Sequence, residues 1–442
     1  MSRYELPQLQ DIVAELLQEA QRQGASQAEA GVHAQQGLDV TVRLGETETI
    51  EHTNDHGLGV TVYFGQRKGS ANTTDLRPDA IRETVAAACR IARHTEEDSA
   101  AGLAEAELMA QDIPDLDLNH PWEIDAEQAA AIARECETAA RDFDPRIDNS
   151  EGASLHTQDS LFVYGNTHGF VGGYPTTRHS LSCAILAREG DEMQRDYWYT
   201  SSRLPDELDP PEWVGEEAAR RTVARLGSRK LATTECPVIF KADVASGLLR
   251  ALFGAIRGSA LYRKASFLLD HLGEPIFPDW VNICENPLLP RGLASAPFDN
   301  EGVATRAGTI IESGVLRHYL LDSYSARKLG MQTTGNAGGV RNVRIDNTGE
   351  TLEQLMDRIE DGLIVTELMG QGSNLVTGDY SRGAAGYWVE NGEIAYPVSE
   401  ITVAGNLREM FSGLLAVGGD NDIPGSIDTG SWLIERMMVA GN

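Results

Sequence analysis

Apolar residues recur at two different spacings in the first part of the chain. Six of them follow the repeat of a helix: Leu9, Ile12, Val13, Leu16, Leu17 and Ala20. Four segments with alternating polarity come next, at residues 28–33, 38–44, 58–64 and 68–73. The glycines that separate these segments are Gly37, Gly45, Gly57 and Gly65. Alternation is the repeat of a strand with one buried face, so we predict a helix followed by an antiparallel meander.

The same two spacings continue as far as residue 226. Helical spacing returns at residues 78–94, 125–143 and 210–226, whereas residues 147–203 have the alternation and aromatic content of strands. Between the first two of these helices lies an acidic segment, at about residues 95–124, in which apolar residues are scattered. We interpret this segment as a surface-bound connector rather than a tail.

A buried helix is predicted where the second half of the chain begins. The apolar run at residues 237–240 is typical of a buried strand, and Asp243 is placed to cap the helix that follows. Apolar residues cover more than one face of this helix, and glycines along it would let another backbone approach closely. Yet the helix contains no His, Cys or Glu, so it lacks the residues of a two-histidine metal site.

Strands dominate the prediction for the rest of the chain. Glycine is frequent between residues 302 and 314 and between residues 370 and 405, and short helices are predicted at residues 323–329 and 351–361. Helices come first and strands later, without strict alternation, which favours an α+β fold over a doubly wound sheet. We therefore predict two domains. Residues 1–226 form an α/β region with the meander and the acidic connector, and residues 227–442 form a β-rich domain.

Composition narrows the possible functions by exclusion. The formal net charge of −30 repels nucleic acid and anionic lipid, which argues against DNA binding. No apolar run approaches membrane-spanning length, and the first residues do not resemble a signal peptide. The five cysteines are scattered and form no CxxC pair, which favours reduced thiols over disulfides or a zinc–thiolate site. We expect a cytoplasmic protein that binds neither nucleic acid nor membrane.

Two segments could carry a metal or an anion. His52 and His56 have the i, i+4 spacing of a zinc helix, but Thr rather than Glu follows the first, and the surrounding pattern is that of strands. Two histidines beside a turn are the plainer interpretation. Residues 370–374 form a glycine-rich loop that could bind an anion, although a loop whose glycines need positive φ explains it as well. The chain contains no P-loop, no GxSxG and no complete dinucleotide fingerprint.

The carboxylates of Asp299 and Glu301 leave two interpretations open. They flank Asn300 in a loop that leads into a predicted strand at residues 302–306. Two carboxylates at this spacing could hold a metal or act as acid and base. Asp299 could equally accept hydrogen bonds from its own backbone in a turn, with Gly302 at the bend.

Seven segments of the second half, taken in order, resemble one protein family. They are the helix at residues 247–262, PFDNEG at 297–302, GTIIESGVL at 308–316, YLLD at 319–322, SARKLG at 325–330, GDYSRG at 378–383 and GYWVENGEI at 386–394. The series resembles the TldD/PmbA metalloprotease family, also called the modulator of DNA gyrase family. The similarity runs from the first helix to the C-terminus. It implies a C-terminal domain built on a large curved β-sheet.

Within that family the chain resembles the PmbA (TldE) type more than the TldD type. For TldD-type members the resemblance implies a helix with HExxxH, which supplies two zinc ligands and a base, and a late Cys as the third ligand. The corresponding helix here, residues 248–260, has no His or Glu, and residues 416–423 contain no Cys. We therefore expect neither zinc nor catalytic residues in this chain, and zinc in a TldD-like partner.

The resemblance also implies a function and a partner. It implies a two-subunit peptidase that cleaves small or unfolded peptides, as in the maturation of peptide antibiotics and the degradation of an antitoxin. We expect a TldD-like partner, and a homodimer when the chain is alone. Two loops are the expected substrate-binding residues: Phe298, Asp299, Asn300, Glu301 and Gly302, with Gly378 and Asp379. Two rival hypotheses remain: a homodimeric peptide-binding adaptor that acts alone, and an enzyme that uses Asp299 and Glu301.

Overall fold

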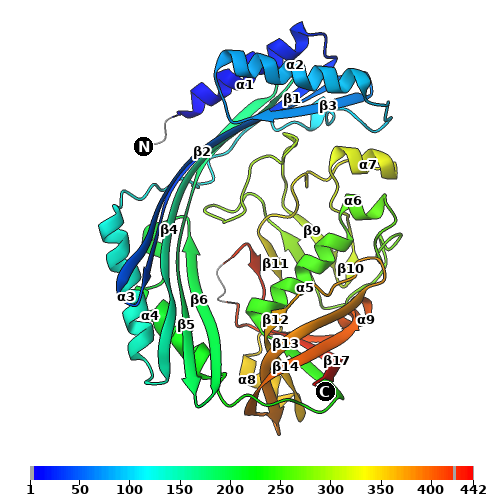
Figure 1. The fold of residues 1–442 in the computed structure, drawn as a ribbon. Coiled ribbons are helices and arrows are strands. Elements are labelled where there is room, and N and C mark those ends of the chain that lie inside the picture. The colour runs from blue at the N-terminus through cyan, green and yellow to red at the C-terminus, as the bar shows by residue number, and fades with distance from the viewer. Residues whose placement is uncertain (1–3, 422–424, 442) are drawn as a thin grey trace.

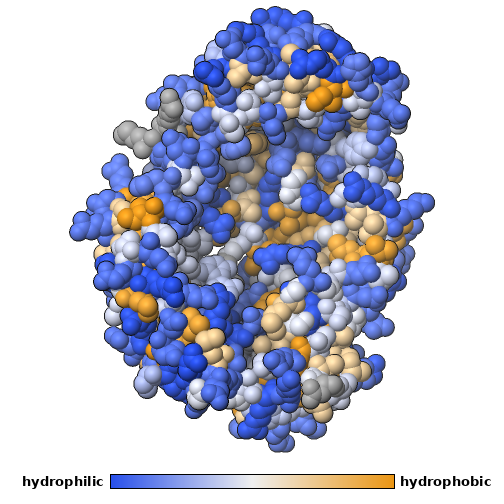
Figure 2. Space-filling model, in the orientation of Figure 1, coloured by the Kyte–Doolittle hydropathy of each residue, from blue (hydrophilic) through white to orange (hydrophobic). Residues whose placement is uncertain are grey.

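A computed structural model describes residues 4–421 and 425–441 of the chain. A long curved sheet from the first half arches around a compact C-terminal domain, with helices on its outer side (Figure 1). The space-filling view shows that this face of the molecule is hollowed between the curved sheet and the C-terminal domain (Figure 2). The predicted α+β class is therefore confirmed.

The curved sheet is antiparallel throughout and has the strand order β3-β2-β1-β4-β5-β6. Its strands are β1 (Gln27–Arg43), β2 (Glu46–Phe64), β3 (Arg67–Thr73), β4 (Ile147–Asn166), β5 (Val171–Glu189) and β6 (Glu192–Ser202). The predicted meander is present, and the turns at Gly45 and Gly65, where φ is +83° and +61°, are confirmed. The predicted breaks at Gly37 and Gly57 are wrong, because β1 and β2 run through them.

Close packing explains why these two glycines interrupt the sequence pattern without ending a strand. A Cβ at Gly37 would lie 2.8 Å from the carbonyl oxygen of Thr157 on β4, and a Cβ at Gly57 would lie 2.5 Å from the ring of His33. A Cβ at Gly37 would therefore meet backbone, and one at Gly57 would displace the ring of His33, although the backbone stays extended at both positions. The predicted turn beside His52 and His56 is also wrong, because both residues lie within β2 and pair with β1.

Four helices cover the convex face of the curved sheet in two pairs (Figure 1). They are α1 (Leu6–Arg22), α2 (Pro78–His94), α3 (Ala126–Asp142) and α4 (Pro211–Val223). Most of the apolar positions predicted for these helices face the sheet and form two separate cores, one under each pair, whereas Ile91 of α2 is exposed. A capping box at Asp125 fixes the start of α3, close to the predicted residue. Because the helices take one face, the concave face is left to the C-terminal domain.

The acidic connector crosses from the curved sheet to the C-terminal domain. It contains one short 3-10 helix, η1 (Ala106–Leu108), and a second, η2 (Pro205–Glu207), lies later in the first half. The guanidinium of Arg327 donates to the carbonyl oxygens of Ala100 and Gly102, at 3.1 Å each, and to that of Leu103. The connector is thus held by the C-terminal domain rather than by the surface of the first domain alone.

Two sheets form the C-terminal domain. One has the order β14-β13-β12-β7-β17-β15, and pairing of β14 with β17 closes it into a barrel. Its strands are β7 (Thr234–Phe240), β12 (Asp361–Met369), β13 (Asp379–Glu390), β14 (Glu393–Asn406), β15 (Leu414–Val417) and β17 (Trp432–Ala440). The other sheet consists of β8 (Ile283–Glu285), β9 (Gly308–Glu312), β10 (Val315–Leu316), β11 (Val343–Ile345) and β16 (Ile427–Asp428).

The helices of this domain are α5 (Ala242–Ala255), α6 (Gly258–Leu261), α7 (Ser323–Leu329), α8 (Leu352–Asp357) and α9 (Leu407–Ser412). The helix at residues 323–329 is confirmed, whereas that predicted at residues 351–361 ends earlier. Residues 302–306 form isolated bridges instead of the predicted strand. In the described part of the chain, no helix is both long and apolar enough to cross a membrane.

The predicted central helix is divided in two. α5 ends at Ala255, and Arg257 then bridges to Leu320 before α6 begins at Gly258. A Cβ at Gly258 would lie 2.1 Å from Oγ of Ser325, so the glycine allows α7 to approach closely, whereas Gly247 faces open space. The predicted cap at Asp243 is also wrong: Lys241 is the N-cap residue, and Asp243 lies in the first turn.

Asp243 takes part in an ion-pair network that joins the two halves of the molecule. Arg221 on α4 contacts Asp243 at 2.8 Å and Asp196 on β6 at 3.5 Å. Arg225 contacts Asp196 at 3.5 Å and also Glu367 on β12. Because Arg221 and Asp196 are buried, removing one partner leaves a charge without compensation. The network therefore fixes the curved sheet against α5 and the barrel.

Replacing Arg221 tests this contact. We expect Arg221→Met to lower the free energy of unfolding by about 3 kcal/mol, because it leaves two carboxylates with less compensation. Arg220→Met is the matched control, since Arg220 is half exposed and, among the described residues, forms an ion pair only with Glu217 of its own helix, a contact worth less than about 1 kcal/mol. Urea denaturation of both variants is the measurement, and equal losses of stability would contradict the proposed role of the network.

Candidate functional site

The loop at residues 297–302 is organised around the side chain of Asp299, which is only 1% exposed. Its Oδ1 accepts hydrogen bonds from the backbone N–H groups of Glu301 at 2.9 Å and Val303 at 3.0 Å, and its Oδ2 accepts one from Ala337 at 3.0 Å. Burial raises the pKa of Asp299, and these three donors act in the opposite direction. The carboxylate therefore stabilises the backbone conformation of its own loop.

Phe298 anchors the same loop to the curved sheet. Its side chain is 1% exposed, and its ring centroid lies 5.2 Å from that of Phe170 and 5.4 Å from that of Tyr174, both edge-to-face. Phe162 stacks at 6.3 Å on the same ring. Aromatic contacts of this kind add to the free energy gained by burial. Phe298 thus connects the C-terminal domain to the concave face of the sheet.

Asn300 and Gly302 complete the turn. The backbone N–H of Asn300 donates to the carbonyl oxygen of Ala337 at 3.1 Å, while its side chain is exposed toward the cavity described below. Gly302 has φ +77°, and a Cβ there would lie 2.8 Å from the ring of Tyr164. A glycine is therefore required both by the backbone conformation and by the close approach of the tyrosine.

Glu301 is bound to the first residue of α7. Its Oε2 accepts hydrogen bonds from the backbone N–H of Ser323 at 2.9 Å and from the hydroxyl of Ser323 at 2.6 Å. The pKa of Glu301 is raised to about 7, mainly by burial; the bonds from Ser323 oppose this shift, and the negative charges of Asp299 and Glu29 add to it. A carboxyl group with this pKa exists in both protonation states near neutral pH.

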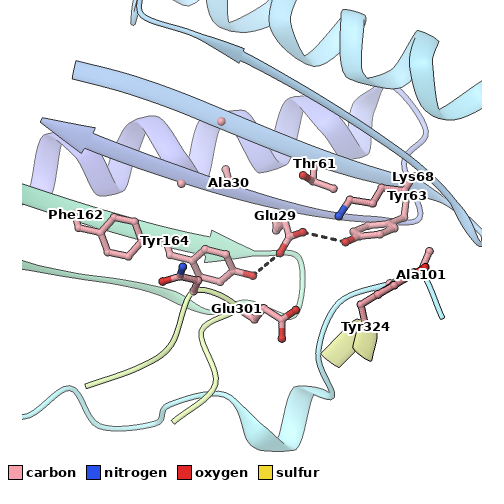
Figure 3. Close-up of a pocket in the computed structure, with 14 residues that line it drawn as sticks. Glu29, Ala30, Thr61, Tyr63, Lys68, Ala101, Phe162, Tyr164, Glu301 and Tyr324 are labelled. Atoms are coloured by element: carbon pink, nitrogen blue, oxygen red, sulfur yellow. Dashed lines mark hydrogen bonds between the residues drawn. The ribbon is translucent and has the colours of Figure 1, made fainter. Parts of the chain in front are cut away.

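Glu301 faces a second carboxylate, Glu29 of β1, across a cavity of about 380 Å³ (Figure 3). Glu29 accepts hydrogen bonds from the hydroxyls of Tyr63 on β2 and Tyr164 on β4, each at 2.9 Å. Burial, followed by the charge of Glu29, raises the pKa of both tyrosines, so both hydroxyls remain donors. The cavity is lined by Glu29, Ala30, Gly31, Gly59, Thr61, Tyr63, Lys68, Ala101, Gly102, Phe162, Tyr164, Asn300, Glu301 and Tyr324.

The structure places the other predicted loop elsewhere. Gly378 has φ +84°, and its N–H donates to the carbonyl oxygen of Asn374 at 2.7 Å. Asp379 is exposed and accepts a bond from the hydroxyl of Thr377 at 2.6 Å. This turn borders a shallow cavity of about 510 Å³ formed with residues 371–375 and Ser381. The two predicted loops therefore line different cavities.

Sequence reasoning missed Glu29, Tyr63 and Tyr164. The hydrogen bonds that join Glu29 to the two tyrosines span 34 and 135 positions of the chain. In the sequence, Glu29 is one polar residue among several on an alternating strand, and nothing there marks it. The register of β1 between β2 and β4 brings these residues together.

The pKa of Glu301 predicts a pH-dependent stability. Because this pKa is raised, the folded state binds the proton more tightly than the unfolded state between the ordinary value and about 7, so stability falls as the pH rises through that window. Glu301→Gln stays neutral and can still accept from Ser323. We expect the variant to gain up to about 3 kcal/mol over the parent between pH 5 and pH 8 in urea titrations. A difference that does not change with pH would contradict the shifted pKa.

Replacing Asp299 should have a different effect. In Asp299→Asn the amide nitrogen faces a backbone N–H whichever way it is turned, so at least one buried donor loses its acceptor. We expect a loss of about 1–3 kcal/mol in the free energy of unfolding at every pH. Asp379→Asn is the control, since Asp379 is exposed, and it should change stability by less than about 0.5 kcal/mol. Equal effects in the two variants would show that Asp299 does not organise the loop.

Three family models match the chain in order. They describe PmbA/TldA metallopeptidase domain 1 at residues 28–92, the central domain at residues 119–226 and the C-terminal domain at residues 233–441. The Metalloprotease PmbA of Escherichia coli O157:H7 is 52% identical over 414 residues, which cover 94% of this chain and 92% of that protein.

Solved structures share the whole fold. A crystal structure of a proposed modulator of DNA gyrase from Bacteroides thetaiotaomicron has a TM-score of 0.92 and 28% identity, and the match covers 98% of each chain. TldE from Thermococcus kodakarensis has a TM-score of 0.84 at 20% identity, covering 97% of this chain and 100% of that one, which shows a common fold. Because the family models together span most of the sequence and the similarity to PmbA extends over nearly its full length, the chain belongs to the PmbA/TldD metalloprotease family.

Proposed function

We propose that the chain is the PmbA/TldE-type subunit of a two-subunit zinc peptidase. In this role it shapes the chamber that receives small or unfolded peptides, and a TldD-like partner supplies the zinc. The observation that carries the proposal is the set of side chains on α5, the helix that corresponds to the zinc-binding helix of TldD-type members. α5 is largely buried and carries no His, Cys or Glu.

The residues present do not fit a zinc ion. Asp243 is the one residue of α5 with a carboxylate, imidazole or thiol side chain, and Arg221 engages it at 2.8 Å. Across residues 4–421 and 425–441, no group of three or more His, Cys, Asp or Glu side chains is arranged to hold a metal. Stable zinc sites need three or four such ligands. The sequence also has no Cys after Cys284, although residues 422 and 423 of the expected third-ligand segment lie outside the described residues.

The concave face of the curved sheet supports a role in holding peptides. Beside the aromatic residues that contact Phe298, this face carries polar side chains: Gln158 donates to Gln35 at 3.2 Å and to Ser160 at 2.8 Å, on the face that also carries Glu29. This face looks onto the hollow seen in Figure 2. A polar wall opposite a peptidase domain suits substrates that are bound through their backbone, because such binding does not depend on side-chain identity. The loops at Phe298–Gly302 and at Gly378–Asp379 are the proposed contributions of the C-terminal domain.

Exposed apolar side chains support a partner surface on the C-terminal domain. Among its described residues eight large ones are exposed: Leu272, Leu289, Met331, Met369, Val376, Ile394, Leu415 and Met438. Side chains of this kind are enriched at the centre of protein interfaces. We propose that the contact with the partner, and the contact of the homodimer, lie on this domain.

Metal analysis tests the proposal that the partner, and not this chain, holds the zinc. We expect the purified, tag-free chain to hold no stoichiometric zinc, because α5 has no free ligand. A TldD-like partner prepared in parallel is the control and should hold about one zinc per chain. Close to one zinc per chain in this protein, measured by elemental analysis after dialysis, would contradict the proposal.

Sedimentation velocity tests the partnership. We expect a homodimer when the chain is alone and a mixed complex when a TldD-like chain is added. Val376→Glu should weaken both assemblies, since Val376 is 55% exposed on the C-terminal domain. Ile91→Glu is the matched control, because Ile91 is 48% exposed on α2 and far from that domain's strands. A monomer under both conditions, or equal weakening by the two variants, would contradict the proposed interface.

A further inference from the structure

We propose that the cavity between Glu29 and Glu301 binds a primary ammonium group, either the amino terminus of a peptide or the side chain of a lysine. The ligand class rests on the proposed function. A chamber for peptides must hold the ends or the side chains of a peptide so that the bond to be cleaved lies at the partner's zinc. The cavity itself is defined by the geometry of residues from both halves of the chain (Figure 3).

The charge balance of the cavity requires a positive ligand or a proton. Glu29 receives two tyrosine hydroxyls and Glu301 receives two donors from Ser323, and in the described part of the chain no cationic side chain pairs with either carboxylate. Hydrogen bonds from neutral donors stabilise a carboxylate, but they do not cancel the repulsion between two of them. An ammonium group between the two carboxylates would cancel it and would be charged in its own right at neutral pH.

Two of the cations near the cavity are committed to other partners. Arg327 is bound to the connector and to Glu105, and Lys328 pairs with Asp98 at 2.7 Å. Lys68 lines the cavity and is exposed, with Nζ 6.0 Å from the centre of the Tyr63 ring, and among the described residues no ion pair joins it to Glu29 or Glu301. The protein therefore surrounds the two carboxylates with basic groups without placing one between them. That position is left for a ligand.

The walls of the cavity favour an ammonium group over a metal ion. Four aromatic rings line it: Tyr63, Phe162, Tyr164 and Tyr324. Aromatic faces attract organic cations and also pack against the carbon atoms that carry them. Metal ions such as Ca²⁺ take six to eight oxygen ligands, and two carboxylates on opposite walls supply too few.

The size of the cavity limits the ligand to the end of a chain or to one side chain. Its volume of about 380 Å³ lies near the lower end of the range for small-molecule pockets, about 300–1,000 Å³. Gly31 and Gly59 pair across β1 and β2 and both line the cavity. A Cβ at Gly59 would meet no atom within 4 Å, so the absence of a side chain there leaves the space open.

The test is calorimetric titration of the isolated full-length chain with three peptides that differ in whether they have a free amino terminus or a lysine. The probes are a lysine-free hexapeptide with a free amino terminus, the same peptide N-acetylated, and the N-acetylated peptide with one lysine. We expect binding of the first, the third or both, and at least tenfold weaker binding of the acetylated lysine-free peptide. Binding of the first alone assigns the site to amino termini, and binding of the third alone assigns it to lysine side chains.

Variants test whether the ammonium group binds in this cavity. The double change Glu29→Gln with Glu301→Gln should weaken ammonium binding at least tenfold, whereas Glu216→Gln, on the exposed face of α4, should leave it unchanged. Gly59→Val is an independent test that keeps both carboxylates, because it fills the open space on a strand where a β-branched residue is tolerated. It should abolish binding while the circular dichroism spectrum is retained.

Three results would overturn the proposal. They are no binding of any peptide, equal binding of the acetylated lysine-free peptide, and binding that survives both the double change and Gly59→Val. Assembly with the TldD-like chain is measured on the same preparations by sedimentation. If assembly persists while ammonium binding fails, the inference about the cavity is wrong and the proposed subunit role stands; if assembly fails, the subunit role is wrong whatever the cavity binds.

Discussion

Three backbone N–H groups converge on the buried carboxylate of Asp299, and the position of the cavity follows from this arrangement. The turn that they stabilise sends Phe298 into the aromatic residues of the curved sheet and directs Glu301 toward Glu29. A buried charge is tolerated only when donors satisfy it, so the loop has little freedom to move without a loss of stability. One side chain thereby couples the fold of the C-terminal domain to the geometry of a site shared with the first half.

A second contact, between Arg221 and Asp243, serves the same purpose at the start of α5. Asp243 is the one acidic residue of that helix, and its carboxylate is engaged by the ion pair. The helix therefore contributes to the attachment of the two halves and offers no ligand to a metal. Under the proposed function, the central helix and the loops around the hollow position groups that bind, while a partner supplies the reacting centre of the peptidase. This division would explain why, in this member of a metalloprotease family, the described residues contain no group arranged to hold a metal.

The sequence predicted most helices, the alternation of the first strands and the α+β class, because each depends on spacing within one segment. It failed at Gly37 and Gly57, where the glycine serves contact with a neighbouring strand, and at Asp243, where an ion pair to Arg221 replaces a cap. The loop around Asp299 was recognisable from its residue types. Two interpretations were open, and the carboxylate of Asp299 accepts the backbone hydrogen bonds that the turn interpretation expects. Glu29 and its tyrosines could not be found from the sequence, because only strand register brings them to Glu301.

The central claim is that this chain holds the substrate of a peptidase whose metal lies elsewhere. A crystal structure of the complex with a TldD-like chain, solved with an uncleaved peptide bound, tests it most directly. The account predicts that the peptide lies in the hollow under the curved sheet, with an ammonium group between Glu29 and Glu301 and with the metal on the partner. A peptide bound entirely by the partner, with no contact to this chain, would contradict it.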